Sequence, residues 1–202
     1  MRKALLIILA SLTLNNSNIH AQDEIENRRF EGLYGGIEGG FDRTELFGAE
    51  DNTFYYGLNL GYRLHSSRDW VFGIEGSFGD TNFNTRSRAL FSPSGSPLLN
   101  TEFQWSAALT IGKVFGDNNL IFAKVGTAGR QIERSATSLI NGATGETFEL
   151  PANTSHQQGY LLGLGYERAI SKRISLKLSL DYLDFNFSSQ QFQPKVGVNF
   201  KF

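Results

Sequence analysis

The sequence of 202 residues has no cysteine, one methionine and four prolines. Without cysteine the chain forms no disulfide, no thiolate metal site and no cysteine nucleophile, and it cannot carry the acylated cysteine of a lipoprotein. No apolar run after the N-terminus approaches the roughly 20 residues of a transmembrane helix. A basic excess is also missing, with 19 Lys and Arg against 20 Asp and Glu, so we expect no nucleic-acid partner.

The sequence is rich in glycine and aromatic residues, with 22 Gly, 17 Phe and 7 Tyr. Aromatic side chains favour strands, and glycine favours turns and close backbone approach. Long runs of helix-forming residues are missing. The composition therefore favours an all-β chain.

Residues 1–21 have the pattern of a cleaved export signal. Arg2 and Lys3 form a basic start, residues 4–14 are apolar, and Ala21 ends a plausible cleavage site. The apolar run is too short to span a membrane as a helix. We therefore expect a signal peptide at 1–21 and one mature domain at 22–202, with 17 basic against 20 acidic residues once Arg2 and Lys3 are removed.

Eight segments of the mature chain alternate apolar and polar residues with period two, which predicts strands. They cover residues 31–41, 54–65, 70–79, 102–115, 120–130, 158–168, 174–183 and 195–202. Short, turn-rich links follow the second, fourth and sixth segments. Longer polar links are expected at about 42–53, 80–101, 131–157 and 184–193. This arrangement predicts a closed, antiparallel, up-and-down transmembrane β-barrel of eight strands, with the long links outside the cell.

Period two does not say which face is buried, so an exported soluble barrel with an apolar interior is the alternative. The polar face is rich in glycine, which suits the narrow interior of an eight-stranded barrel. The apolar face is broad and aromatic toward its ends, as a lipid-facing belt requires. We therefore expect a membrane barrel. Its lumen should hold a paired polar network, structural rather than catalytic, of Glu38, Arg63, Glu75, Glu102, Lys124, Arg130, Glu167, Lys177, Asp181 and Lys195.

Three segments carry a likeness to a known family: 195–202 (KVGVNFKF), 32–40 (GLYGGIEGG) and 163–167 (GLGYE). With them the mature chain resembles the OmpA/OmpX-like small outer-membrane β-barrels. The resemblance implies an integral outer-membrane protein in contact with lipopolysaccharide. It also implies a C-terminal strand that the barrel-assembly machinery reads through Val196, Val198, Phe200 and Phe202. The periplasmic peptidoglycan-binding domain of some members has no counterpart, so cell-wall anchoring is not expected.

Catalytic and metal-binding patterns are weak. His65 precedes Ser66 at a predicted periplasmic turn, on the opposite side from the outer leaflet where a lipid A-modifying enzyme must act. His156 follows Ser155 in a predicted outer link, but no carboxylate of matching spacing accompanies it. The acidic residues of the first link, Asp42, Glu45, Glu50 and Asp51, are more typical of a solvated loop than of a cation site. We expect no cofactor and no bound metal.

The function expected from the sequence is non-enzymatic, with a structural or surface-binding role for the long outer links. Arg86, Arg88, Arg130 and Arg134 lie in or beside those links, where basic residues suit lipopolysaccharide phosphates or an unknown extracellular ligand. Two alternatives remain at this point. One is a narrow channel for small solutes, and the other is a lipid A-modifying enzyme.

Overall fold

The computed structural model describes residues 28–46, 49–66, 69–81, 84–85, 99–134, 137–140, 147–185 and 189–202. The expected signal peptide at 1–21 lies outside these ranges. Within them, no helix is both long enough and apolar enough to cross a membrane.

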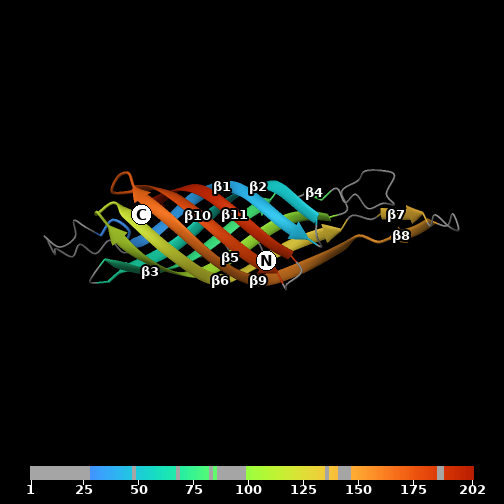
Figure 1. Ribbon diagram of the computed structural model, residues 1–202, viewed down its shortest axis with the longest axis horizontal. Coiled ribbons are helices and arrows are strands. Elements are labelled where there is room, and N and C mark those ends of the chain that lie inside the picture. The colour runs from blue at the N-terminus through green and yellow to red at the C-terminus, as the bar shows by residue number, and fades with distance from the viewer. Residues whose placement is uncertain are drawn as a thin grey trace, which may run out of the picture.

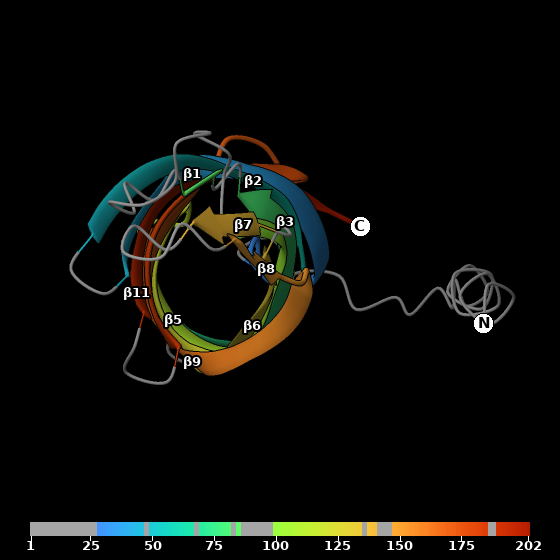
Figure 2. The same cartoon turned by 90° about the vertical axis from the view of Figure 1, so that its right-hand side faces the viewer.

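Eight long antiparallel strands form the body of the described chain, each paired with its neighbours (Figure 1). β3 also pairs with β5, from Gly79 opposite Gln104 to Trp70 opposite Lys113, and this pairing closes the sheet into a barrel. The view along the axis shows the closed ring (Figure 2). The strands are β1 (Gly32–Leu46), β2 (Ala49–His65), β3 (Trp70–Thr81), β5 (Leu99–Phe115), β6 (Asn119–Arg134), β9 (Asn153–Ala169), β10 (Ile174–Phe185) and β11 (Ser189–Lys201).

Three short strands lie at the end of the barrel where the long links are. β4 (Asn84–Thr85) pairs with β5, while β7 (Thr137–Ile140) and β8 (Thr147–Leu150) form a separate two-stranded sheet. Figure 1 shows β7 and β8 beyond the other strands along the barrel axis. Both lie within the link predicted at 131–157.

The eight predicted strands are confirmed, but their ends toward the long links were placed too early. The link expected at 42–53 is wrong, because β1 and β2 stay paired up to Leu46 opposite Ala49. β6 and β9 likewise remain paired to Arg134 opposite Asn153, and β10 and β11 to Phe185 opposite Ser189. Hydrogen bonding between strands continues where the apolar alternation has stopped, so the barrel is longer than its apolar pattern.

The opposite end has tight turns. Asp69 (φ 64°) lies in the β2–β3 turn, and Gly116 (φ 55°) and Asp117 (φ 57°) lie in the β5–β6 turn. All three have left-handed backbone conformations, which glycine adopts freely and aspartate tolerates better than most residues. These turns confirm the short links predicted between the second and third and between the fourth and fifth strands.

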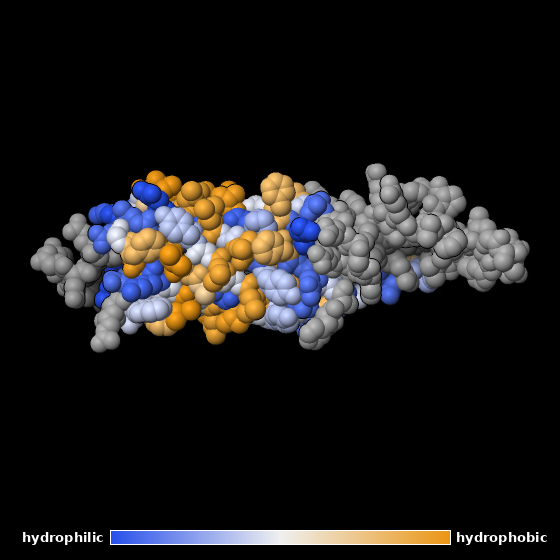
Figure 3. Space-filling view, in the orientation of Figure 1, coloured by the Kyte–Doolittle hydropathy of each residue, from blue (hydrophilic) through white to orange (hydrophobic). Residues whose placement is uncertain are grey.

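Through the middle of the barrel, exposed side chains alternate with buried or half-buried ones along the long strands. Leu58 and Leu109 are 59% and 64% exposed, whereas their neighbours Asn59 and Thr110 are 4% and 7% exposed. Figure 3 shows hydrophobic residues concentrated around the middle of the barrel, with hydrophilic residues toward both ends of the described part. The apolar face points outward and the polar face inward, opposite to the arrangement of a soluble barrel with an apolar core.

Candidate functional site

The lumen holds a cluster of charged side chains from seven of the eight long strands. Four are cationic and four anionic, and each residue is at most 6% exposed. They are Glu38 (β1), Arg63 (β2), Glu75 (β3), Lys124 (β6), Glu167 (β9), Lys177 and Asp181 (β10), and Lys195 (β11). Period two aims them inward, and the opposing glycines leave them room. A Cβ at Gly163, for example, would lie 2.6 Å from the Asp181 carboxylate and 2.7 Å from the Lys124 chain.

Six of these residues form a closed ring of alternating charge. Lys177 contacts Glu75 at 2.7 Å, Glu75 contacts Lys124 at 3.4 Å, and Lys124 contacts Asp181 at 2.9 Å. Asp181 in turn contacts Lys195 at 2.6 Å. Glu38 completes the ring, 2.9 Å from Lys195 and 3.5 Å from Lys177. Each charge in the ring therefore has two opposite neighbours.

A second charge pair lies beside the ring. Arg63 Nη2 donates to Glu167 Oε2 at 2.8 Å and lies 4.0 Å from Glu75, which connects it to the ring. Ser175 and Asn199 also donate to Glu167. The guanidinium of Arg63 lies 4.0 Å from the centre of the Tyr34 ring, a cation–π contact.

Hydroxyl and amide groups occupy further acceptor positions of the carboxylates. Tyr34 donates to Glu75 at 2.7 Å, while Tyr55 and Asn59 donate to Glu38 at 3.1 and 3.2 Å. Buried charges are tolerated when they are paired and hydrogen-bonded. Every charge in this cluster is ion-paired and its net charge is zero, while Asp181 is held by its ion pairs with Lys124 and Lys195 and its carboxylate oxygens have no hydrogen-bond partner among the described residues. The geometry of the cluster can crosslink strands and obstruct the lumen.

Two apolar clusters lie at either side of the charged layer. At the end of the tight turns, Phe30 packs with five buried residues, and toward the other end Phe185 packs with four. The first cluster is completed by Val71, Val114, Leu120, Phe122 and Ala169, and the second by Ala108, Ala128, Leu161 and Leu183. Sequence analysis missed most of these residues. The sequence contained part of the information. Leu161 and Leu183 each lie two positions from a residue predicted to face the lumen, Gly163 and Asp181, and residues two apart on a strand face the same side.

Beyond the second cluster lies a layer of glutamine side chains, which hydrogen-bond to one carboxylate, Asp42, and one guanidinium, Arg130. Gln104 and Gln193 exchange amide hydrogen bonds at 3.3 Å, and Gln193 donates to Asp42 at 3.2 Å. Arg130 donates twice to Gln157 and lies 4.4 Å from the centre of the Phe185 ring. Asp42 was expected in a solvated acidic loop; that expectation is wrong, because β1 continues through this position and turns Asp42 into the lumen, where it is fully buried.

The remaining predicted site residues are Glu102 and four residues near the C-terminus. Glu102 lies at a β-bulge between Thr101 and Phe103, and its side chain falls outside the described residues. In the C-terminal strand Val196, Phe200 and Phe202 are exposed, and Val198 is half-buried.

The two histidines among the described residues lie far apart along the chain and in different settings. His65 is half-buried at the end of β2, whereas His156 and Ser155 are exposed on β9. Among the described residues, no group of three or more His, Cys, Asp or Glu side chains is placed to hold a metal ion.

The barrel is closed and antiparallel, with an exposed apolar belt and a lumen filled by charged side chains. It has tight turns at one end and extended hairpins at the other. Small outer-membrane proteins have this architecture. The chain belongs to that family: the model of the "Outer membrane protein beta-barrel domain" matches residues 6–202. The protein is therefore an integral outer-membrane β-barrel.

Solved structures agree with this fold. The chain is similar to the attachment invasion locus protein Ail of Yersinia pestis, solved with the heparin analogue sucrose octasulfate. The two share 16% identity over 85% of this chain and 99% of that one, with a TM-score of 0.56. It is also similar to Neisserial surface protein A, with 16% identity over 85% of this chain and 98% of that one and a TM-score of 0.51. Comparison with curated protein sequences gives no match.

Proposed function

We propose that the protein is a sealed, non-enzymatic barrel that contributes to the outer membrane structurally and binds at its cell surface through its extended outer end. The main support for a sealed lumen is the ring of six alternating charges across it. It lies between two apolar clusters, so a solute would have to displace paired charges as well as packed side chains.

The extended strands support a surface role. In small outer-membrane barrels the turns on the periplasmic side are short and the extracellular connections are longer. On that basis the paired ends of β6 and β9, together with β7 and β8, face outward from the cell (Figure 1). Consecutive side chains from Asn153 to His156 are exposed, so both faces of β9 are open to solvent there.

Export and assembly complete the proposal. We propose that cleavage after Ala21 releases the mature chain and that the barrel-assembly machinery reads the C-terminal strand. Val196 and Phe200 present their side chains on the outer face of β11, and Phe202 follows the end of that strand, so all three are accessible. Lipopolysaccharide, the outer-leaflet lipid, is the expected neighbour of the aromatic residues at the outer end of the apolar belt.

Planar bilayer recordings test the sealed barrel. The purified protein should insert without a steady open-pore conductance, while a general porin in the same bilayers should give stable steps. A steady conductance comparable to that of the porin would contradict the proposal and support the narrow channel. Mass analysis of lipid A from cells with and without the protein tests the enzyme alternative, for which we expect identical spectra.

A variant with residues 135–152 replaced by a two-residue turn tests the surface role. Because β6 and β9 are already paired at Arg134 and Asn153, the barrel should remain folded. Sucrose octasulfate, the ligand in the Ail structure, is a defined first probe. We expect the full-length protein in nanodiscs to bind it and the shortened variant to bind more weakly. Equal binding by both proteins would place the contact surface elsewhere.

A further inference from the structure

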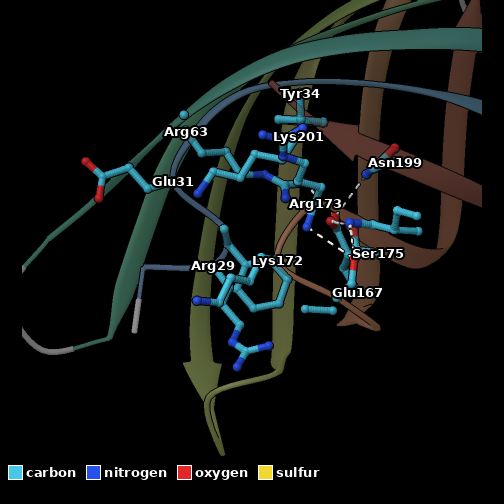
Figure 4. Close-up of a pocket in the computed structure, with 15 residues that line it drawn as sticks. Arg29, Glu31, Tyr34, Arg63, Glu167, Lys172, Arg173, Ser175, Asn199 and Lys201 are labelled. Carbon is cyan, nitrogen blue, oxygen red and sulfur yellow. Dashed lines mark hydrogen bonds and ion pairs between the residues drawn. The ribbon is translucent and has the colours of Figure 1, made fainter. Parts of the chain in front are cut away.

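The periplasmic end of the barrel contains a small hollow with an excess of positive charge. Arg29 from the segment before β1, Lys172 and Arg173 from the β9–β10 turn, and Lys201 at the end of β11 line it. Its deeper wall includes Tyr34, Arg63 and Glu167, with Ser175 and Asn199 beside them (Figure 4). We call this site the basal hollow.

The acidic groups near the basal hollow are already engaged. Glu167 accepts from Arg63, Ser175 and Asn199 (Figure 4). Glu31 pairs instead with Arg28, at 3.3 Å, and points away from the other labelled side chains in Figure 4. Over the described ranges of the chain, the four lining cations Arg29, Lys172, Arg173 and Lys201 form no ion pair. The described lining therefore has five cationic side chains, Arg63 included, against the two carboxylates of Glu31 and Glu167.

Two hydrogen-bond donors at the basal hollow, on Arg29 and Lys201, have no carboxylate partner among the described residues. Among the described residues, the buried Nε of Arg29 has no hydrogen-bond partner. Lys201 Nζ donates to the neutral carbonyl oxygen of Arg28 at 3.0 Å, and no carboxylate is paired with it in that same part of the chain. A buried donor without an acceptor costs free energy, which an anion in the hollow would offset.

The position of the basal hollow favours phosphate as the anion. Exposed apolar residues next to it, Ile170, Ile174 and Phe202, belong to the lower edge of the lipid-facing surface, the level at which phospholipid phosphates lie. The cavity volume is about 20 Å³, enough for a water-sized group such as a phosphate oxygen but not for a whole headgroup. Two guanidinium groups and two ammonium groups suit the several oxygens of phosphate.

We propose that the basal hollow binds a phosphate group, either of an inner-leaflet phospholipid or of a soluble periplasmic phosphate compound. The charged ring of the lumen and the outer end of the barrel take no part in this binding. The site is thus independent of the sealed, surface-binding role proposed above.

NMR of the protein in nonionic detergent and phosphate-free buffer tests the basal hollow. Pyrophosphate and dihexanoyl phosphatidylglycerol are titrated separately while the Nε–H resonance of Arg29 is followed. A saturable shift with the lipid alone supports the site and assigns it to phospholipid; a shift with both supports it and shows that soluble phosphate is sufficient. No saturable shift with either compound would overturn the proposal.

Two variants separate a specific site from diffuse positive charge. Lys172→Gln with Arg173→Gln should weaken binding at least about tenfold, because charge-assisted hydrogen bonds to phosphate are lost. Lys113→Gln is the matched control: Lys113 is exposed near the same end of the barrel but does not line the hollow, so binding should change less than about twofold. Equal weakening by both variants would overturn the proposal.

The acidic residues Asp23, Glu24 and Glu26 precede Arg29 in the sequence, and a further variant tests whether their carboxylates compete with phosphate. A variant with all three changed to their amides should bind the phosphate probes as the unmodified protein does, or more tightly. Binding that appears only in this variant would show that the chain's own carboxylates occupy the hollow, and would overturn the proposal.

Discussion

At the scale of single residues, Glu75 has four side-chain partners in the lumen, as Glu38 does. The Glu75 carboxylate pairs with Lys124 and Lys177, lies 4.0 Å from Arg63, and accepts the hydroxyl of Tyr34. These partners come from four other strands, β1, β2, β6 and β10. Removal of the carboxylate would therefore leave the Tyr34 hydroxyl without its acceptor and take one anionic neighbour from each of three buried cations, Arg63, Lys124 and Lys177.

Glu75→Ala should lower the free energy of unfolding in detergent or lipid by about 3–5 kcal/mol, the usual cost of truncating one member of a buried ion pair. The control is Gln158→Ala, at an exposed position on β9, which should change stability by less than about 0.5 kcal/mol. Urea titrations of both variants in the same lipid provide the comparison. Equal stabilities would mean that Glu75 is hydrated and that the ring does not hold the barrel together.

Two glycines differ in the room around them: Gly126 lies on the inward face of β6, and Gly76 is exposed on the outward face of β3. A Cβ at Gly126, on β6, would overlap the carbonyl oxygen of Ala107 on β5, whereas a Cβ at Gly76 on β3 would lie 3.7 Å from its nearest neighbour. Gly126→Ala should therefore destabilise the barrel by about 1–3 kcal/mol through overpacking, and Gly76→Ala should be nearly neutral. Thermal unfolding of the two variants checks this, and a neutral Gly126→Ala would show that β5 and β6 can move apart at no cost.

At the scale of elements, period two was sufficient to predict all eight long strands. A strand with lipid on one face and a narrow lumen on the other must alternate apolar and polar residues. The part of each strand that crosses the membrane can therefore be identified from the sequence. Beyond the membrane that constraint ends. At Arg43 and Asn52, which pair across β1 and β2, both side chains are polar and exposed, and nothing in the pattern marks them as strand.

The lumen was predictable in part for the same reason. The alternation of each strand is enough to predict that Lys124 and Lys177 face inward. It does not predict their ion-pair partners, because those depend on how strands far apart in the sequence are staggered. Phe30 was not predictable, because it precedes β1 and has no alternating neighbours. Gly32, with φ of 105°, supplies a backbone conformation favourable only to glycine just where this segment joins β1.

Phe30 is expected to close the periplasmic end of the lumen, because it is buried in the same apolar cluster as Val71 and Phe122. The absence of native cysteine allows a direct probe: Val71→Cys should react slowly with a water-soluble maleimide. Adding Phe30→Ala should raise that rate at least about tenfold, since truncating a buried aromatic leaves a cavity.

Ser66→Cys serves as the matched control for this labelling experiment. Ser66 is exposed at the same end of the barrel, so its cysteine variant should react quickly whether or not Phe30 is present. Unchanged labelling of Val71→Cys on removal of Phe30 would show that other residues seal this end.

At the scale of the whole molecule, the structure separates two surfaces. The outer wall carries the exposed aliphatic and aromatic residues, and the inner wall carries paired charges and amides. The same strands would be untenable in water with this orientation, because a contiguous apolar belt of this extent would remain exposed. Lipid around the barrel and a filled lumen are thus two consequences of one arrangement.

Accessibility of spin labels tests this arrangement most directly. Labels at Leu58, Leu109 and Leu178, all exposed on the outer wall, should collide with lipid-soluble oxygen and be shielded from an aqueous nickel reagent. Labels at their inward neighbours Asn59, Thr110 and Ser179 should be shielded from both reagents, because those side chains are buried in the lumen. If instead the three leucine positions were shielded from both reagents, or open to nickel, the outer wall would not face lipid and the membrane barrel would be wrong.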